Sequence, residues 1–315
     1  MIRPNDKPFE VILRSRLADF EGQIGTLPGI RNPSFRNTFI AQLIESDRRN
    51  RFIASISNKN HSPALADPLH ANFDPLKAAV IFKQGGSFEE ACWLVFLSVH
   101  FGKNGSTGWR LSRDVYGALG AGQRWDWNRV SRSPLAFREW LDSSYITLKG
   151  GDGIKRHFGN HRKYLSLDAW KPAGTGAAID SYVEWINENG GHSTLFADAV
   201  RSSNNNPRLA FSHLYKQMIQ VASFGRTAKF DYLTMLGKLE LANIEPDSAY
   251  LVGATGPFRG AKLLFDGSIN SNSTQKTMDS KIIQLESYLN VGMQSMEDSL
   301  CNWQKSPARF IPYRG

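Results

Sequence analysis

Residues 281–303, KIIQLESYLNVGMQSMEDSLCNW, carry the clearest structural pattern in the chain. Their apolar residues recur at steps of three and four: Ile282, Leu285, Leu289, Met293, Met296, Leu300 and Trp303. Steps of three and four place side chains on one face of an α-helix. The stretch therefore predicts one amphipathic helix that buries a single apolar stripe.

A second helix is predicted around the longest apolar run, ACWLVFLSVHF, which spans Ala91 to Phe101. Its 11 residues are too few to cross a bilayer, which needs about 20. The run therefore indicates a buried core helix. Ser87 is expected to cap the start of this helix, and Glu90 stands at the position that completes a capping box. The N-terminal residues show no signal-peptide pattern, so a soluble, cytoplasmic protein is expected.

Helical spacing also recurs in several other segments, whereas strand-like alternation is scarce. These segments are WRLSRDVYGAL ending at Gly120, AIDSYVEWINENGG from Ala178, and LAFSHLYKQMIQVASF from Leu209. Residues 1–77 hold short amphipathic helices that are broken by prolines. The chain is therefore predicted to be mainly α, with an N-terminal helical region at 1–77 and a helical domain at 78–315, or with both as one continuous globular unit.

The composition is that of a folded, basic protein. The chain has 315 residues, of which 41% are hydrophobic and 21% charged, and its formal net charge is +9. Such a charge attracts polyanions, so nucleic acid is the first expected partner and an anionic membrane surface the second. Only two cysteines are present, Cys92 and Cys301. Two thiols cannot build a disulfide framework or a four-thiolate zinc site.

Positive charge is concentrated between Lys103 and Lys163. This stretch holds 12 Lys or Arg and five acids, and thus seven of the nine net charges. Trp109, Trp125, Trp127 and Trp140 lie in the same stretch, and Tyr164 directly follows it. Basic side chains neutralise phosphates and aromatic faces stack on extruded bases. We therefore expect nucleic-acid contact here, with a solvated basic face over core tryptophans as the alternative.

The segment HFGNHRKY, residues 157–164, is the densest part of this basic stretch. Asn160 and His161 offer directional hydrogen bonds, and Arg162 and Lys163 offer charge for phosphates. No second His or Cys pair lies nearby, so the spacing does not indicate zinc. By itself the segment is equally compatible with a structural role.

Two glycine-containing turns precede predicted helices further along the chain. In VASFGRTAKFDYL, Gly225 is expected to form a turn between helices and Arg226 to follow it. In LVGATGPFRGAKLLF, Gly253, Gly256 and Gly260 bracket Arg259. A helix, a glycine turn and a second helix can present backbone N–H groups to a phosphate. Both segments are compatible with a helix-hairpin-helix DNA clamp, although glycine turns between helices are common.

Two groups of carboxylates stand out as candidates for acid chemistry. Asp231 follows Gly225 by six residues, about one and a half helical turns. Glu297 and Asp298 lie on the last predicted helix, where Asp298 and Asn302 share one face at a spacing of four. A carboxylate and an amide at the edge of a core suit a base pocket. The alternative is a surface acid pair that is neutralised by lysines.

Several of these segments together resemble one protein family. They are EEACWLVFLSVHFGKN, GWRLSRDVYGALG, FGNHRKYLSL, FGRTAKFDYL, GATGPFRGAKLLF and MEDSLCNWQK, which extend from about Phe88 to Lys305. This ordered set resembles the alpha-glutamyl/putrescinyl thymine pyrophosphorylases. The resemblance implies a fold similar to helix-hairpin-helix DNA glycosylases. It also implies hypermodified bases of phage DNA as substrates, such as bulky thymines or glucosylated hydroxymethylcytosine.

The resemblance implies base excision that leaves an abasic site in duplex DNA, and with it a role in antiviral defence. Hydrolysis by water is the favoured chemistry, whereas the family name implies attack by pyrophosphate on the sugar carbon. No metal or organic cofactor and no membrane is implied. Two other functions remain open. One is a non-catalytic reader of modified DNA, and the other is a biosynthetic transferase acting on nucleotides.

The resemblance also suggests roles for the candidate residues. Asp298, Glu297 or Asp231 would stabilise the cationic sugar as the base leaves. Base contacts are assigned to Asn302, Trp303, Asn160, His161 and Trp109. DNA contacts are assigned to Lys103, Arg162, Lys163, Gly225, Arg226, Gly256 and Arg259. In typical glycosylases of this type an aspartate follows the hairpin by about 20 residues, which points instead to Asp247 or Asp279.

Overall fold

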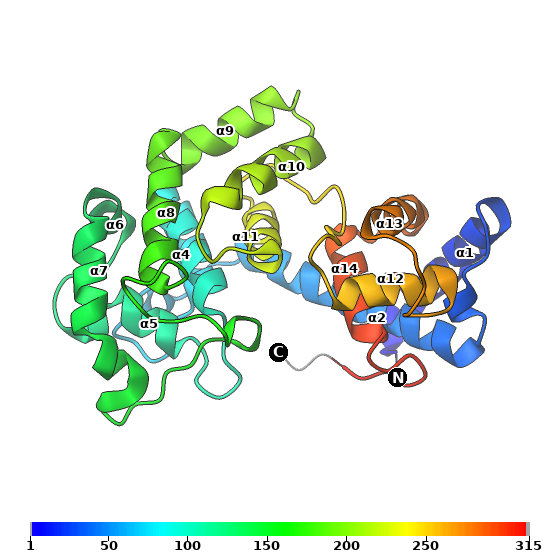
Figure 1. The fold of residues 1–315 in the computed structure, drawn as a ribbon, viewed down its shortest axis with the longest axis horizontal. Helices are drawn as coiled ribbons and strands as arrows, with labels where there is room; N and C mark the ends of the chain where they lie inside the picture. The colour runs from blue at the N-terminus through cyan, green and yellow to red at the C-terminus, as the bar shows by residue number, and fades with distance from the viewer. Residues whose placement is uncertain (1, 313–315) are drawn as a thin grey trace. The chain divides into compact units, whose positions relative to one another are not determined.

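Helices account for nearly all regular structure in this protein. The computed structural model describes residues 2–312, and within them 14 α-helices are joined by turns and short 3-10 or π segments. Within the same residues there is no β-strand, only the isolated bridges between Asn104 and Gly108 and between Ser166 and Gly174. The predicted mainly-α fold is confirmed (Figure 1).

The chain divides into two compact units, and the division differs from the expected one. One unit combines residues 2–54 with residues 246–312, and the other is formed by residues 55–245. The expected boundary after residue 77 falls inside helix α3 (Pro75–Gln84). Helix α2 (Pro33–Ser57) carries the chain across the first division. Each unit is described below by itself, as the discontinuous unit and the central unit.

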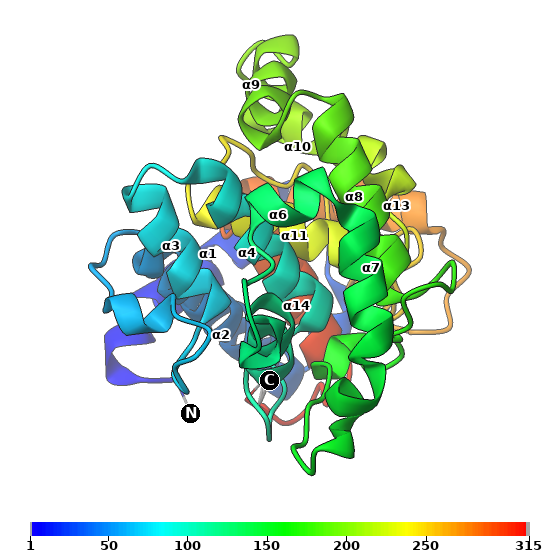
Figure 2. The same ribbon diagram turned by 90° about the vertical axis from the view of Figure 1, so that its left-hand side faces the viewer.

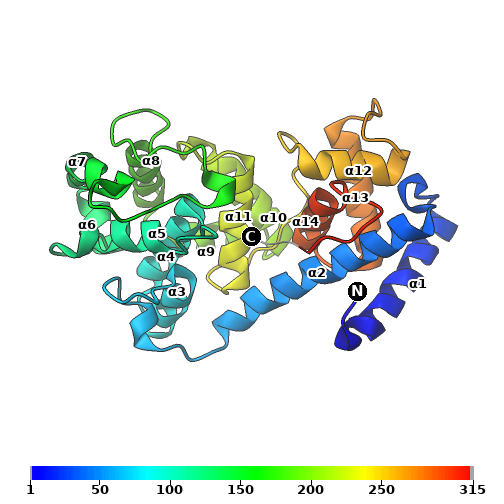
Figure 3. The ribbon, with the colours of Figure 1, turned by 90° about the horizontal axis from the view of Figure 1, so that it is seen from below.

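The discontinuous unit is built from both ends of the chain. Besides α2 it contains α1 (Lys7–Gln23), α12 (Gly256–Asp266), α13 (Gln275–Leu289) and α14 (Met293–Trp303). Figure 3 shows α1 and α2 beside the group formed by α12, α13 and α14. Residues from all five helices share one apolar core, so this unit closes only when the two ends of the chain meet.

The apolar stripe at residues 282–303 is buried as predicted, but it does not belong to one helix. All seven stripe residues are fully buried. The helix breaks after Leu289, because Asn290 (φ 49°) and Gly292 (φ 82°) adopt positive φ values. Left-handed backbone ends an α-helix and is tolerated best by Gly and Asn. The prediction of a single helix is therefore wrong at residues 290–292.

Glycines allow α12 and α14 to pack closely. A Cβ atom at Gly260 would lie 2.3 Å from the carbonyl oxygen of Leu300, and one at Gly256 would lie 2.6 Å from Cys301 Sγ. Residues 239–255, which precede α12, contain no helix. The predicted helix-hairpin-helix at Leu251–Phe265 is therefore wrong. Gly256 and Gly260 serve helix packing, whereas Gly253 lies in the turn before α12 with a φ of 79°.

The central unit surrounds helix α4 (Phe88–Phe101), which is buried from Glu90 to Phe101. Helices α3, α5, α6, α9 and α11 contact it (Figure 2). The remaining helices of this unit have these bounds: α5 (Arg110–Tyr116), α6 (Trp127–Arg132), α7 (Pro134–Ser143), α8 (Thr175–Glu188), α9 (His192–Ser202), α10 (Pro207–Gln217) and α11 (Arg226–Lys238). The predicted core helix is confirmed.

The predicted capping box at the start of α4 is absent. Ser87 is the N-cap residue but its side chain makes no capping hydrogen bond. The Glu90 carboxylate instead accepts hydrogen bonds from Tyr116 Oη at 2.5 Å and from the Trp127 backbone N–H at 2.6 Å. Burial raises the pKa of Glu90 even though both donors act against it. This carboxylate therefore ties α4 to α5 and α6.

Within residues 2–312, no helix combines the length and the apolar character that a membrane crossing requires. Cys92 is buried and Cys301 is partly buried, and the two are not joined by a disulfide.

Candidate nucleic-acid interface

Three adjoining pockets follow one surface of the central unit. The first, of about 400 Å³, lies between residues 65–77 and 103–113. The second, of about 570 Å³, shares Thr107 and Arg110 with the first. The third, of about 390 Å³, shares His157 with the second. Because neighbouring pockets share lining residues, the three are treated together as one depression, and the first pocket is called the Trp109 cleft below.

Cations without an acidic partner line this depression. They are Lys103, Arg110, Lys149, Lys155 and Lys163, and none forms an ion pair with any residue in the range 2–312. This set of five is called the basic surface. Unpaired like charges repel each other and raise the local positive potential. The basic surface is therefore suited to a bound polyanion.

Other cations of the same stretch are already neutralised inside the protein. Arg156 is buried and pairs with Asp114 at 2.6 Å and with Asp152 at 2.7 Å. The hydrogen bond with Asp152 raises the pKa of Arg156 further, with Asp114 adding to it. Arg113 also pairs with Asp114, at 2.8 Å. These pairs fasten the loop at 152–158 to α5, so the loop supports the basic surface.

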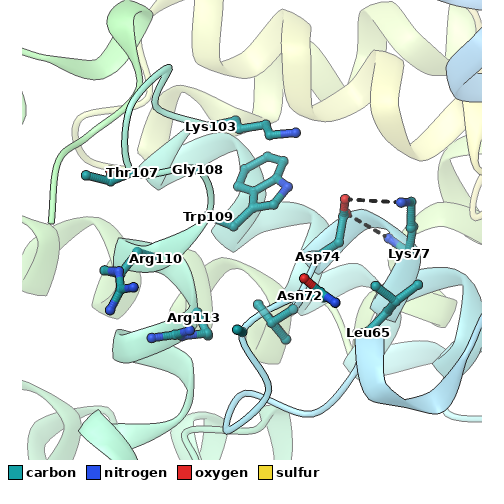
Figure 4. Close-up of a pocket in the computed structure, with 12 residues that line it drawn as sticks. Leu65, Asn72, Asp74, Lys77, Lys103, Thr107, Gly108, Trp109, Arg110 and Arg113 are labelled. Carbon is teal, nitrogen blue, oxygen red and sulfur yellow. Dashed lines mark hydrogen bonds and ion pairs between the residues drawn. The ribbon is translucent and has the colours of Figure 1, made fainter.

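The Trp109 cleft combines an aromatic face with several hydrogen-bond donors. Figure 4 shows Trp109 below Lys103, with the indole nitrogen turned toward Asp74 and Lys77. Lys103 Nζ lies 6.0 Å from the centre of the Trp109 ring. Trp109 Nε1 and Thr107 Oγ1 are shielded from solvent and have no hydrogen-bond partner within the described part of the chain. A buried donor without an acceptor is costly, which suggests that a ligand supplies one.

Four of the predicted site residues of the central unit line this depression. Lys103 and Trp109 line the first pocket, and Asn160 and Lys163 line the third. His161 is exposed on the short helix Asn160–Arg162 beside them. The fold thus brings residues 103–109 and residues 160–163, which are about 50 positions apart in sequence, to the same depression. This agrees with the expectation of one binding region between Lys103 and Lys163.

Arg162 has a different place from the predicted phosphate contact. Its side chain is 8% exposed, Nε donates to the Val99 carbonyl at 2.8 Å, and Nη2 donates to Asp231 Oδ2 at 2.8 Å. A guanidinium held by these internal acceptors is not presented to a phosphate. The DNA-contact prediction for Arg162 is therefore corrected: this arginine positions Asp231.

Asp231, on helix α11 of the central unit, is the carboxylate that pairs with Arg162. Its side chain is 39% exposed. One oxygen is held by Arg162, whereas Oδ1 has no hydrogen-bond partner among residues 2–312. Asp231 thus offers an accessible, oriented oxygen.

A buried histidine completes the surroundings of Arg162. Burial lowers the pKa of His100 to about 3, and the charge of Arg162 adds to this effect. The ring is therefore neutral at physiological pH. Its Nε2 is hydrogen-bonded to Thr175 Oγ1 at 3.0 Å, and the side chain is 1% exposed. His100 therefore links α4 to the start of α8 inside the core and does not reach solvent.

The first predicted glycine turn has the expected arrangement of helices. Helix α10 ends at Gln217 and continues as a 3-10 turn to Gln220, and α11 starts after Gly225. No heavy atom would lie within 4 Å of a Cβ at Gly225, and Arg226 lies 5.1 Å from the centre of the Phe230 ring. Phosphate binding by Gly225 and Arg226 stays a prediction.

The other predicted site residues belong to the discontinuous unit. Asp298 forms an ion pair with Arg49, and Asn302 Nδ2 donates to Asp298 Oδ1 at 2.9 Å. The shared face predicted for Asp298 and Asn302 is confirmed, but both carboxylate oxygens are engaged within the protein. Glu297 beside them is partly buried, and Arg259 is exposed without an ion pair among the described residues.

Trp303 is not available to stack on a base. Its side chain is fully buried, Nε1 donates to the Phe35 carbonyl at 3.2 Å, and its ring centre lies 5.1 Å from that of Phe39. The prediction of base contact by Trp303 is corrected to a core role. Gly256, predicted to contact DNA, is likewise covered by Cys301.

The alternative aspartates, Asp247 and Asp279, both hydrogen-bond to the segment before α12 in the discontinuous unit. Asp247 accepts a hydrogen bond from Tyr250 Oη at 2.6 Å. Asp279 Oδ2 accepts one from the Leu251 backbone N–H at 2.9 Å. These contacts give both residues a structural role.

Sequence reasoning counted Arg110, Lys149 and Lys155 among the basic residues without singling them out, and it missed His157 and Lys77 as lining residues. The positive charge of Arg110, Lys149 and Lys155 is the sequence feature that could have identified them. Which cations lack an acidic partner depends on folding, so the sequence could not separate them from Arg113 and Arg156.

Fold and surface together define a helical protein with an unneutralised cationic depression. The family model of the alpha-glutamyl/putrescinyl thymine pyrophosphorylases, clade 3, matches residues 34–315, and the chain belongs to this family. No curated protein and no solved structure matches the chain. The family description names an enzyme and a hypermodified thymine, which places the protein in hypermodified thymine metabolism.

Proposed function

We propose that this protein is a DNA glycosylase that binds duplex DNA, extrudes a hypermodified base and excises it by hydrolysis. Bases of this kind in phage DNA would make the activity an antiviral defence. The observation that carries the proposal is the basic surface, five unpaired cations distributed over three adjoining pockets. Asp231, an accessible carboxylate of the same unit, is held by Arg162, the sequence neighbour of Lys163. Several cations spread over adjoining pockets match a phosphodiester backbone better than they match a single nucleotide.

Asp231 is the carboxylate we assign to catalysis. It lies in the same unit as the basic surface, Arg162 orients it, and Oδ1 is free to face a cationic sugar. Asp298 has both oxygens engaged by Arg49 and Asn302. A carboxylate that stabilises developing positive charge must point at the reacting carbon, which favours the less engaged oxygen.

The proposed reaction exchanges one bond at the sugar for another. The bond between C1′ and the base nitrogen breaks, and its electron pair leaves with the base. A water oxygen then bonds to C1′. One of the two water protons stays on the new C1′ hydroxyl, and the other is transferred to the nitrogen of the departing base. The products are a free modified base and an abasic site, and Asp231 stabilises the positive charge that develops on the sugar.

The test is to incubate the protein with duplex DNA carrying hypermodified thymine, glucosylated hydroxymethylcytosine or unmodified bases, and to identify released bases by mass spectrometry. We expect free modified base and an equal amount of abasic sites. Asp231→Asn should lower the single-turnover rate by a factor of about 10² or more and leave DNA affinity within about twofold. Asp298→Asn and the surface variant Asp198→Asn serve as matched controls.

Other outcomes would replace the proposal. If release requires added pyrophosphate and the sugar carries it afterwards, the chemistry is pyrophosphorolysis, as the family name indicates. DNA binding without any release would indicate a reader. Full activity of Asp231→Asn with loss in Asp298→Asn would move the catalytic role to the discontinuous unit.

A further inference from the structure

The Trp109 cleft has an uneven supply of hydrogen-bonding groups. Four cationic side chains line it, Lys77, Lys103, Arg110 and Arg113, against one carboxylate, Asp74, although Arg113 is already paired with Asp114 outside the lining. The unpartnered Trp109 Nε1 adds a further donor, which Figure 4 shows on the side of Asp74 and Lys77. The cleft therefore offers many donors and few acceptors.

The single carboxylate of the cleft is already committed. Asp74 Oδ1 accepts the backbone N–H groups of Leu76 and Lys77, at 3.1 and 3.2 Å, and so caps the start of α3. Its other oxygen lies 3.8 Å from Lys77 Nζ, which is a weak ion pair. Asp74 thus has little capacity left to attract a cationic ligand.

Lys103 and Arg110 are the cations of the cleft that have no acidic partner within residues 2–312, and Lys103 lies next to Trp109. The Lys103 side chain is exposed. Figure 4 places its ammonium group near the indole of Trp109, on the edge that faces Asp74 and Lys77. A ring stacked on Trp109 would therefore carry its substituent toward Lys103 and Lys77.

From this polarity we infer that the Trp109 cleft receives the modified base and selects an acidic substituent on it. The ligand class is a pyrimidine that bears carboxylates, such as α-glutamyl thymine, in preference to one that bears an ammonium, such as putrescinyl thymine. Carboxylate oxygens can accept from the donors of the cleft, whereas an ammonium would have to share Asp74 with Lys77 and would face the positive charge of Lys103 and Arg110. The inference rests on the proposed function for the source of such a base, but the binding step can be tested without excision.

The test uses modified nucleosides without phosphate, so that the DNA backbone cannot supply the anion. Affinities of the full-length protein for the α-glutamyl, putrescinyl and unmodified thymidine nucleosides are measured by calorimetry, with thymidine 5′-monophosphate as the phosphate control. We expect the α-glutamyl nucleoside to bind at least tenfold more tightly than the putrescinyl one, as one charge-assisted hydrogen bond would produce. Lys103→Glu should reverse the preference. Lys276→Glu makes the same charge change at an exposed position of α13, away from the basic surface, and should retain the preference.

Trp109→Ala provides a second arm, because loss of the stacking face should weaken all the nucleosides by a similar factor. Equal affinity for the acidic and basic nucleosides, or a preference that Lys103→Glu leaves unchanged, would overturn the inference. Tighter binding of thymidine 5′-monophosphate than of the α-glutamyl nucleoside would also overturn it, by making the cleft a phosphate site. If the protein prefers the α-glutamyl nucleoside but releases no base from DNA, the glycosylase proposal is refuted and the inference about the cleft stands. If it releases the base but shows no such preference, the glycosylase proposal stands and the inference about the cleft is refuted.

Discussion

At the scale of single residues, Gly260 shows how one missing side chain sets the distance between two helices. A Cβ there would meet the carbonyl oxygen of Leu300 at 2.3 Å and its Cα at 3.0 Å. Both are backbone atoms of α14, so no rotamer change can relieve the overlap. Gly22, on the exposed side of α1, has no atom within 4 Å of the same position.

We predict that Gly260→Ala lowers the free energy of unfolding by about 3 kcal/mol, because α12 must separate from α14. Gly22→Ala should leave it unchanged or raise it by up to about 1 kcal/mol, since alanine favours an exposed helix. Urea denaturation followed by circular dichroism measures both. Equal stability of the two variants would contradict the close packing of α12 and α14.

Neighbouring residues can also have opposite roles. Arg162 is buried and held by Val99 and Asp231, whereas Lys163 is exposed and lines the third pocket. Both looked alike as phosphate ligands in the sequence. Their difference is set by which way the short helix Asn160–Arg162 turns each side chain.

At the scale of helices, Glu89 joins the start of α4 to the start of α9. Its carboxylate accepts the backbone N–H groups of His192 and Ser193, at 2.9 and 3.0 Å, and the His192 ring Nδ1 at 2.5 Å. The ring Nε2 in turn meets Tyr182 Oη at 2.6 Å. Burial lowers the pKa of His192, so a neutral ring donates to Glu89 and accepts from Tyr182.

This arrangement predicts acid sensitivity. Burial acts to raise the pKa of Glu89, but the hydrogen bonds from the His192 ring and from the backbone N–H groups of His192 and Ser193 outweigh it and lower the pKa to about 2. The unfolded chain, with an ordinary value of 4.5, therefore binds the proton first as pH falls. The stabilisation by ionised Glu89 is complete above about pH 4.5 and is lost progressively toward pH 2.

The check is urea denaturation of the protein and of Glu89→Gln between pH 3 and pH 7. The stability difference between them should be largest near neutral pH and shrink as the pH falls below 4.5. Glu184→Gln, at an exposed position of α8, is the control and should show no such trend. A difference that stays constant with pH would show that Glu89 is not ionised in the folded state.

Helix breaks were the least predictable feature at this scale. The pattern from Ile282 to Trp303 is periodic enough for one helix, yet Asn290 and Gly292 turn the chain between α13 and α14. Three- and four-residue steps can continue across a break when both helices face the same core. Helix α9 was not singled out in the sequence, and α8 and α10 were.

At the scale of the whole molecule, the uneven distribution of charge is the feature with the widest consequence. The net charge is +9, and the five cations of the basic surface have no acidic partner in the described chain. In the discontinuous unit many arginines are paired, among them Arg14, Arg36, Arg48, Arg49 and Arg51. Polyanion binding is therefore expected from the central unit.

This predicts a definite salt dependence for DNA binding. Replacing Lys149, Lys155 and Lys163 by Gln should weaken duplex binding at low salt and reduce the slope of log K against log salt by about one per lysine. Fluorescence anisotropy at several salt concentrations measures this slope. Arg201→Gln removes a cation that pairs with Asp198 on α9 and should leave the slope unchanged. An unaltered slope in the triple variant would exclude these lysines from phosphate contact.

Much of this protein could be predicted from local pattern alone. The helical class, the buried α4 and the burial of every stripe residue from Ile282 to Trp303 follow from periodicity, because an amphipathic helix has one face to hide. The concentration of charge between Lys103 and Lys163 followed from simple counting, as did the family resemblance from ordered motifs.

Only the tertiary structure decided how those parts are used. It joined residues 2–54 to residues 246–312, neutralised Arg156 while leaving Lys155 free, and turned Trp303 into the core while Trp109 lines a cleft. Pairing, burial and orientation depend on residues far apart in the chain. A short window of sequence holds only one partner of each such contact, and the fold brings the other.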